Sequence, residues 1–182
     1  MRKIADYSLR LLIVCTIASG LLAYVYETTF PRIQANIEKE KLAKVKDLLP
    51  EDTLNIKELK KDQIIFFRGF SRNSQNGTII ETSSNGYGGP INLLVGIDKD
   101  GKVTDVAVVS HKETPGLGAK IEETKFLGQF KGRGPRDVML KKDSGNPNDG
   151  IDAIAAATIS SRAVTKAVRE SLEKYGEVKN VR

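Results

Sequence analysis

The sequence has very few of the side chains that bind metals or form disulfides, with one cysteine and one histidine in 182 residues. With Cys15 alone, no disulfide can form within the chain, and a Cys-ligated iron–sulfur cluster, a c-type haem site and a thiolate zinc site are excluded. Because His111 is the only histidine, a His-rich metal cluster is excluded, and so is a Ser-His-Asp triad that does not include His111. We therefore predict no metal site, and any redox chemistry must come from an organic cofactor.

The chain also lacks a concentrated basic surface, although its formal net charge is +6. Part of the excess lies at the N-terminus, and the rest is interspersed with acidic residues. The densest basic segments, residues 131–136 and 141–142, are more simply explained as solvated loops than as a nucleic-acid site. A hydrophobic fraction of 40% and a charged fraction of 29% fit a globular protein. We predict no nucleic-acid partner.

One uncharged apolar run, residues 11–26, has the character of a membrane segment. If the Arg10 side chain extends to the lipid headgroups, the embedded helix covers residues 7–26, which is the ~20 residues needed to cross a bilayer. Basic residues on the short N-terminal side place that end in the cytoplasm by the positive-inside rule. The alternative is a cleaved signal peptide, but the apolar run is longer than the usual hydrophobic region of a signal peptide and a polar helix follows it. We predict a single-pass anchor in the cytoplasmic (inner) membrane, with the C-terminal domain outside the cytoplasm.

Two prolines frame a second expected helix. Pro31 suits the first turn of a helix, the apolar residues after it recur at helical spacing, and Pro50 suits its end. This helix is expected to link the anchor to the globular part. The predicted organisation is therefore an anchor over residues 1–30, a linker helix over residues 31–60 and a globular domain over residues 61–182.

After residue 63 the pattern changes to short apolar runs typical of strands, at residues 64–67, 78–80, 91–97 and 103–109. The last two runs are joined by Asp-Lys-Asp-Gly at residues 98–101, a strong hairpin signal, so this pair is expected to be antiparallel. We expect a helix over residues 121–130, a further short strand at residues 138–140 and a C-terminal helix. Strands in hairpin order with helices at the edges predict an α+β domain with an antiparallel sheet.

The stretch at residues 150–162, Gly-Ile-Asp-Ala-Ile-Ala-Ala-Ala-Thr-Ile-Ser-Ser-Arg, leads into the C-terminal helix. Ser160 or Ser161 is expected to cap this helix and Gly176 to end it, which puts Thr158 at or just before the helix N-terminus. Free N–H groups and the helix dipole favour a phosphate there, and the preceding alanines leave room for one. The alternative is a Ser-capped helix with nothing bound.

A second stretch, residues 110–121, reads Ser-His-Lys-Glu-Thr-Pro-Gly-Leu-Gly-Ala-Lys-Ile. Together and in this order, the two stretches resemble the FMN-binding domain shared by the RnfG and NqrC subunits of ion-translocating electron-transport complexes. The family pattern is Asp, two variable residues, Ser or Thr, Gly, Ala and Thr, and its last Thr carries FMN through a phosphoester bond. Asp152, Ala157 and Thr158 match this pattern. Residues 155–156 are alanines where Ser or Thr and Gly are usual.

The resemblance implies a cofactor site formed by both stretches, with FMN bonded covalently to Thr158. Leu117 would pack on the flavin ring, and Thr114 would face its polar edge or the phosphate. Asp152 would be recognised during attachment, or would instead cap or hydrogen-bond the turn. Tyr87 lies in a Gly-Tyr-Gly-Gly-Pro run that also precedes a core strand in this family, and would lie near the cofactor. Besides Thr158, the expected cofactor contacts are Glu113, Thr114, Gly116, Leu117, Gly118, Ala157, Ser160, Asp152 and Tyr87.

The resemblance implies an electron-carrier subunit of a membrane complex rather than an enzyme in its own right. A threonine hydroxyl is a poor nucleophile without a neighbouring base, so we predict no catalytic residue and expect a separate flavin transferase, using Mg2+ and FAD, to esterify Thr158. The short chain favours RnfG, whose complex couples electron transfer between ferredoxin and NAD to sodium or proton transport, and whose other subunits would be partners. The alternatives are the NqrC subunit of a sodium-translocating NADH:quinone oxidoreductase and a non-redox, membrane-anchored flavin-binding module.

Overall fold

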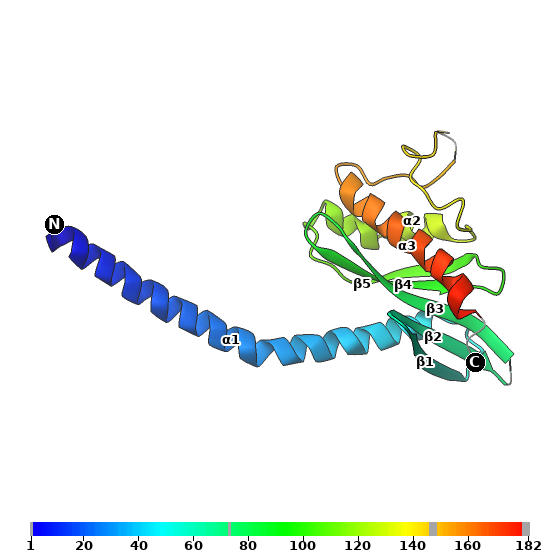
Figure 1. The fold of residues 1–182 in the computed structure, drawn as a ribbon, viewed down its shortest axis with the longest axis horizontal. Helices are drawn as coiled ribbons and strands as arrows, with labels where there is room; N and C mark the ends of the chain where they lie inside the picture. The colour runs from blue at the N-terminus through cyan, green and yellow to red at the C-terminus, as the bar shows by residue number, and fades with distance from the viewer. Residues whose placement is uncertain (1, 73, 146–148, 180–182) are drawn as a thin grey trace. The chain divides into compact units, whose positions relative to one another are not determined.

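The structure is a computed structural model that describes residues 2–72, 74–145 and 149–179. The chain divides into two compact units, Met1–Glu40 and Lys41–Arg182. The first unit is helical, and the second contains a sheet with helices packed on it (Figure 1). The α+β class expected from the sequence is therefore confirmed for the second unit.

The N-terminal helix α1 runs without a break from Arg2 to Leu48 and includes Pro31. The prediction of a separate linker helix that begins at Pro31 is therefore wrong. A proline inside a helix removes one backbone hydrogen bond, but the Ala-, Glu- and Lys-rich residues that follow it favour helix and carry α1 onward. Among the described residues, α1 alone is long and apolar enough to cross a membrane, and its apolar part is uncovered. The functional division of the chain at residues 30 and 60 stays a prediction.

The second unit is built on a five-stranded sheet in which every strand pairs with the next one along the chain and runs antiparallel to it. The strands are β1 (Asn55–Lys61), β2 (Ile64–Ser71), β3 (Ser74–Asn85), β4 (Pro90–Ile97) and β5 (Val103–Ser110). The predicted apolar runs lie in β2 to β5, and β1 is an addition to the predicted set. The hairpin between β4 and β5 is confirmed, and Asp98 Oδ1 accepts hydrogen bonds from the N–H groups of Asp100 and Lys102, both at 2.9 Å.

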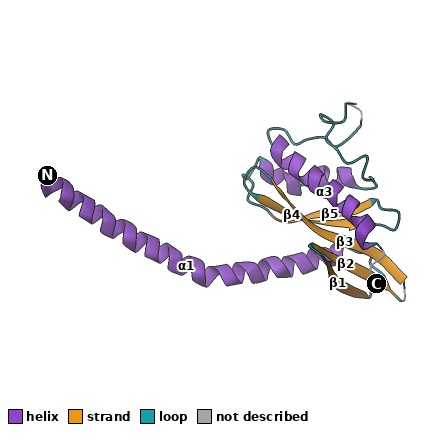
Figure 2. Ribbon diagram, in the orientation of Figure 1, coloured by secondary structure: helices purple, strands orange, loops and turns teal. Residues whose placement is uncertain are grey.

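Helix α3 (Thr158–Val178) covers one face of this sheet and contacts β3 and β4 (Figure 2). Its buried residues recur three or four positions apart, so that one side of the helix faces the strands. The core between them includes Phe66, Ile80, Leu93, Val95, Val164, Val168 and Leu172. At the far end, Arg68 of β2 donates a hydrogen bond to the backbone oxygen of Val178. α3 thus continues past Gly176, where its end was predicted.

The last turns of α1, from Lys41 onward, belong to the second unit and cover the opposite face of the sheet. Phe67 follows the core residue Phe66 and points the other way, and the Lys41 Nζ atom lies 5.9 Å from the centre of its ring. Val45 is fully buried, and Lys44 Nζ donates to the backbone oxygen of Val108 at 2.7 Å. The sheet is therefore covered on both faces.

Between β5 and α3 the structure is more irregular than the sequence suggests. The helix expected over residues 121–130 is three short turns, η1 (Gly118–Glu122), α2 (Thr124–Leu127) and η2 (Gly128–Phe130). The strand expected at residues 138–140 is reduced to one isolated parallel bridge between Leu140 and Ile151. In these segments the rings of Phe126 and Phe130 pack edge to face, with centres 5.5 Å apart. The chain then continues to the start of α3.

Candidate functional site

Three segments that are distant in sequence meet around one pocket of about 430 Å³ at the N-terminal end of α3. They are the loop between β3 and β4, the loop between β5 and η1, and the first turn of α3 with the residues before it. A pocket of this size lies in the range of small-molecule and cofactor sites. Its lining residues are Tyr87, Glu113, Thr114, Leu117, Gly118, Ala156, Ala157, Thr158, Ile159 and Ser160.

The pocket brings together every residue expected at the cofactor site except Gly116 and Asp152. Whether these residues contact FMN stays a prediction, but their convergence from three segments is a property of the fold. Ala156 and Ile159 line the pocket without having been expected there. The sequence does carry a signal for Ala156, since it occupies the position where the resembled family has glycine.

Glu113 is the polar centre of this site and is 5% exposed. Its Oε1 atom accepts a hydrogen bond from the Gly88 N–H group at 3.0 Å, and its Oε2 atom accepts one from the Ser160 hydroxyl at 2.6 Å. The Glu113 N–H group donates to His111 Nδ1 at 3.0 Å, and His111 Nε2 lies 3.2 Å from a carboxyl oxygen of Glu122. One carboxyl group therefore joins all three segments of the pocket, with His111 supporting its backbone.

Two glycines allow this close assembly. A Cβ atom added at Gly88 would fall far inside van der Waals contact with the backbone oxygen of Lys112, which has no freedom to move away. A Cβ atom added at Gly118 would meet the Glu113 carboxyl group in the same way and would lie 3.1 Å from Ser160 Oγ. The wall of the pocket therefore requires glycine at both positions.

The start of α3 offers unpaired N–H groups to the pocket. The residue that precedes the helix, Ala157, gives no side-chain cap, so the predicted serine cap is wrong. Ser160 instead donates to Glu113, while Ser161 donates to the Ala157 oxygen at 2.9 Å and accepts from the Ile154 N–H group at 3.0 Å. Thr158 is the first residue of the helix, as predicted, and is partly exposed. An uncapped N-terminus beside a hydroxyl group fits a phosphate.

The turn in front of Thr158 is strained at one residue. The Ala157 N–H group donates to the Ile154 oxygen at 3.1 Å and closes the turn, and Ala156 in its third position has a φ of 60°. Positive φ at this position favours glycine, and a side chain there costs roughly 1–2 kcal/mol. The strain lies directly beside the hydroxyl group of Thr158.

Ala156→Gly is expected to stabilise the folded protein by about 0.5–1 kcal/mol, because relief of the left-handed strain exceeds the added flexibility of glycine in the unfolded chain. The measurement is urea unfolding of the full chain in detergent, followed by circular dichroism. Ala155→Gly is the matched control, since Ala155 is in the same turn and lacks a positive φ. It should destabilise the protein slightly, and equal effects of the two changes would contradict the strain at Ala156.

The two expected site residues outside the pocket have other contacts. Asp152 pairs through its carboxyl group with Lys141 Nζ at 2.9 Å, and its N–H group donates to the Gln129 side chain at 2.7 Å. Its carboxyl group therefore does not cap the turn before Thr158, and its recognition during attachment stays a prediction. Gly116 takes a positive φ of 78° in the loop that presents Leu117 and has open space where a side chain would be.

Large apolar side chains form the rim of the pocket. Tyr87 is 73% exposed, Ile159 is 53% exposed and Leu117 is 47% exposed, and they come from the three different segments. Exposed apolar side chains gathered around a pocket that also contains polar groups, here Glu113 and Ser160, are typical of a site for a planar, partly apolar ligand. Among the described residues, no cluster of three or more His, Cys, Asp or Glu side chains is arranged to hold a metal ion.

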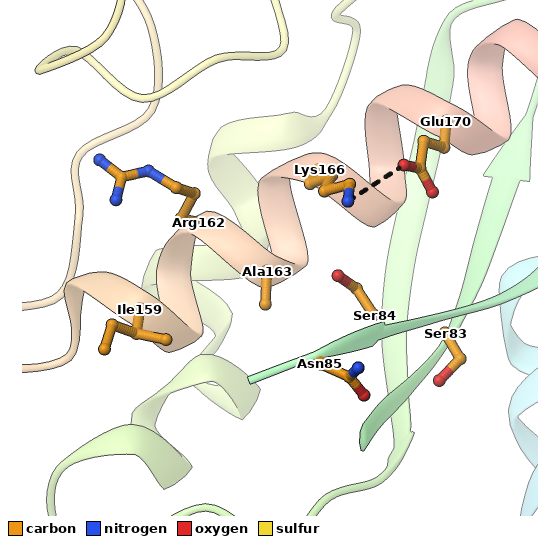
Figure 3. A pocket seen from close by; sticks show the side chains of 8 residues that line it. All are labelled: Ser83, Ser84, Asn85, Ile159, Arg162, Ala163, Lys166 and Glu170. Carbon is orange, nitrogen blue, oxygen red and sulfur yellow. Dashed lines mark ion pairs between the residues drawn. The ribbon is translucent and has the colours of Figure 1, made fainter. Parts of the chain in front are cut away.

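A second pocket, of about 400 Å³, adjoins the first and shares Ile159 with it (Figure 3). It lies between α3 and the end of β3 and is lined mainly by polar side chains, namely Ser83, Ser84, Asn85, Arg162, Lys166 and Glu170, with Ile159 and Ala163. Lys166 and Glu170 form an ion pair at 3.7 Å across one turn of the helix. Its polar walls make it less suited to a flavin ring than the first pocket.

Known proteins resemble this chain in sequence and in fold. The FMN-binding domain family matches residues 86–173, a range that contains every residue of the first pocket. The G subunit of the proton-translocating ferredoxin:NAD(+) oxidoreductase complex of Clostridium ljungdahlii is 38% identical over 166 residues, covering 90% of this chain and 86% of the relative. The G subunit of the ion-translocating oxidoreductase complex of Methanosarcina acetivorans is 30% identical and covers 94% of each chain.

Among solved structures, the C subunit of the Na(+)-translocating NADH-quinone reductase of Parabacteroides distasonis has a similar fold. The TM-score is 0.56 over 79% of this chain and 84% of that one, at 21% sequence identity. At this identity the likeness concerns the fold alone, whereas the similarity by sequence is to the G subunits described above.

Proposed function

This chain belongs to the family of the G subunits of ion-translocating oxidoreductase complexes, and we propose that it carries FMN covalently on Thr158. The chain is an FMN-binding electron-transfer subunit of such a membrane complex. The relatives are named as subunits of proton-translocating ferredoxin:NAD(+) or ion-translocating oxidoreductase complexes, and we propose that this complex likewise couples electron transfer between ferredoxin and NAD to the movement of sodium ions or protons.

The observation that carries the covalent link is the position of Thr158. Its hydroxyl group stands at the uncapped N-terminus of α3, where the first N–H groups can bind a phosphate, and it borders the pocket with the apolar rim. FMN supplies reversible electron transfer when bound, and the residues of this chain bind and orient it. Leu117, Ile159 and Tyr87 would hold the ring, while Thr114 would face its polar edge or the phosphate.

Attachment requires an outside catalyst. In the described part of the pocket, the one candidate base, Glu113, is already hydrogen-bonded to Gly88 and Ser160, and neither His111 nor Cys15 lines the pocket. A flavin transferase using Mg2+ and FAD would join Thr158 Oγ to the FMN phosphorus and break the pyrophosphate bond. AMP would leave, and the hydroxyl proton would pass to a base of the transferase.

α1 anchors the chain in the membrane, and we propose that the N-terminus is cytoplasmic. Arg2, Lys3 and Arg10 lie before or at the start of the apolar run, against Asp6 alone, and this excess of positive charge favours the cytoplasmic side. α1 would cross the cytoplasmic (inner) membrane, and the FMN-binding domain would lie on its outer side, outside the cytoplasm. There, a covalent bond prevents loss of a cofactor that the cytoplasmic pool could not replace.

Intact-protein mass spectrometry of the full chain, coexpressed with a flavin transferase, tests the proposal. We expect a mass increase of one FMN less one water, because the FMN phosphoryl group replaces the hydroxyl hydrogen of Thr158 when AMP leaves FAD. Trypsin cleaves after Lys142 and Arg162, so the modified peptide covers residues 143–162, and fragmentation should place the flavin on Thr158. Flavin fluorescence in a denaturing gel should accompany the same band.

An unmodified mass would be followed by the double change Ala155→Ser and Ala156→Gly, which restores the family pattern before Thr158. Modification of this variant alone would mean that the two alanines prevent attachment in the present sequence. Continued absence of flavin from the denatured chain would contradict the covalent link.

A further inference from the structure

We propose that Arg162 is a second ligand of the FMN phosphate, with Asp143 holding its guanidinium group in place. The inference rests on the proposed attachment at Thr158. Arg162 follows Thr158 by four residues, and on a helix such a pair shares one face with Cβ atoms about 5–6 Å apart. Side chains in a helix lean toward its N-terminus, which directs Arg162 back toward Thr158.

The hydrogen bonds of Arg162 leave part of its guanidinium group available. Arg162 Nε donates to Asp143 Oδ2 at 3.1 Å, and Nη2 donates to Asp143 Oδ1 at 3.0 Å. This uses one edge of the group, and within the described residues Nη1 donates to no acceptor. A guanidinium group has five N–H donors, so three remain for a ligand. Asp143 therefore fixes the side chain without consuming its capacity to bind an anion.

Charge favours the same arrangement. The hydrogen bonds from Arg162 hold the pKa of Asp143 below its usual value, so the pair stays ionised at neutral pH. A phosphodiester on Thr158 adds one negative charge, which the helix N-terminus offsets only in part. Arginine binds phosphate oxygens through parallel N–H groups, a geometry that lysine does not provide.

The surroundings of Arg162 provide a matched comparison. Lys166 lies one further turn along α3, lines the same second pocket and pairs with Glu170 (Figure 3). Figure 3 also shows that the Arg162 side chain extends away from this pair and, in this view, leaves the helix on the side opposite to Ile159. Arg162 and Lys166 are exposed to a similar extent, at 54% and 59% of their side-chain surface. Of these two residues, only Arg162 lies within about one helical turn of Thr158.

The test uses the full chain after mass spectrometry has confirmed complete attachment of FMN, in wild type and in Arg162→Gln, Arg162→Lys and Lys166→Gln. The readout is the 31P NMR signal of the phosphodiester, compared with the same protein in denaturant. We expect the folded wild type to differ from the denatured position, Arg162→Gln to move most of the way toward it, and Arg162→Lys to be intermediate. Lys166→Gln should match wild type.

A second readout excludes a general structural effect of the substitutions. Attachment of FMN should raise Tm more in wild type than in Arg162→Gln, while the unmodified forms of the two proteins should melt together, since Arg162 is on the surface. An unchanged 31P signal in Arg162→Gln would overturn the inference and leave the proposed function intact. Equal displacement by Lys166→Gln would overturn it as well, because it would indicate only a general positive potential. A wild-type chain without FMN would overturn both.

Discussion

Thr158→Ala is expected to remove covalent flavin completely, even though two further hydroxyl groups lie within three residues of it. Ser160 is 1% exposed and donates to Glu113, and Ser161 is fully buried and bonded to Ala157 and Ile154. Neither serine can present its oxygen to a transferase without breaking these contacts. The measurement is intact mass together with flavin fluorescence in a denaturing gel, and both signals should fall to background.

Thr158→Ser is the matched control and should keep the flavin, because it keeps a hydroxyl group at the same position. Both variants should change the free energy of unfolding by no more than about 0.5 kcal/mol, since Thr158 is partly exposed at the first turn of α3. Loss of flavin in Thr158→Ala therefore could not be attributed to unfolding. Flavin found on Ser160 or Ser161 in this variant would contradict the assignment of the acceptor.

The positions of Thr158 and of the strands are predictable because local patterns determine them. β2, β4 and β5 are short runs rich in apolar residues, β3 contains such a run at residues 78–80, and the Asp-Lys-Asp-Gly turn joins β4 to β5. β1 has no such pattern. It is a lysine-rich edge strand that pairs with β2 on one side only, and its sequence resembles a solvated loop.

Contacts between distant segments explain what the sequence does not predict. Ser160 and Ser161 are sound helix-capping residues by type, but Glu113, 47 positions earlier, takes the Ser160 hydroxyl group, and Ser161 bonds the turn before the helix. Pro31 marks a helix start in isolation, yet the helix-forming residues on both sides carry α1 through it. The family pattern places Asp152 at the site, whereas the side chain of Lys141 holds it outside the pocket.

Glu113→Ala is expected to destabilise the folded protein by about 2–4 kcal/mol. It leaves the buried Ser160 hydroxyl group without its acceptor, removes the acceptor of the Gly88 N–H group at the edge of the site, and empties the space between Gly86 and Gly118. Each buried polar group that loses its partner costs roughly 1–3 kcal/mol. Urea unfolding of the full chain in detergent, followed by circular dichroism, gives the change in free energy.

Glu113→Gln separates the hydrogen bonds from the shape of the side chain. The amide has the same size, its oxygen can accept from Gly88, and the Ser160 hydroxyl group can turn to accept from its NH2 group, so the cost should be only about 1 kcal/mol. Glu123→Ala, in an exposed residue nearby, should cost less than about 0.5 kcal/mol. Hydrogen exchange at Gly88 should accelerate in Glu113→Ala and in neither of the other variants. A Glu113→Ala protein as stable as wild type would mean that the three segments are joined by apolar packing alone, and the flavin pocket would not depend on its buried carboxyl group.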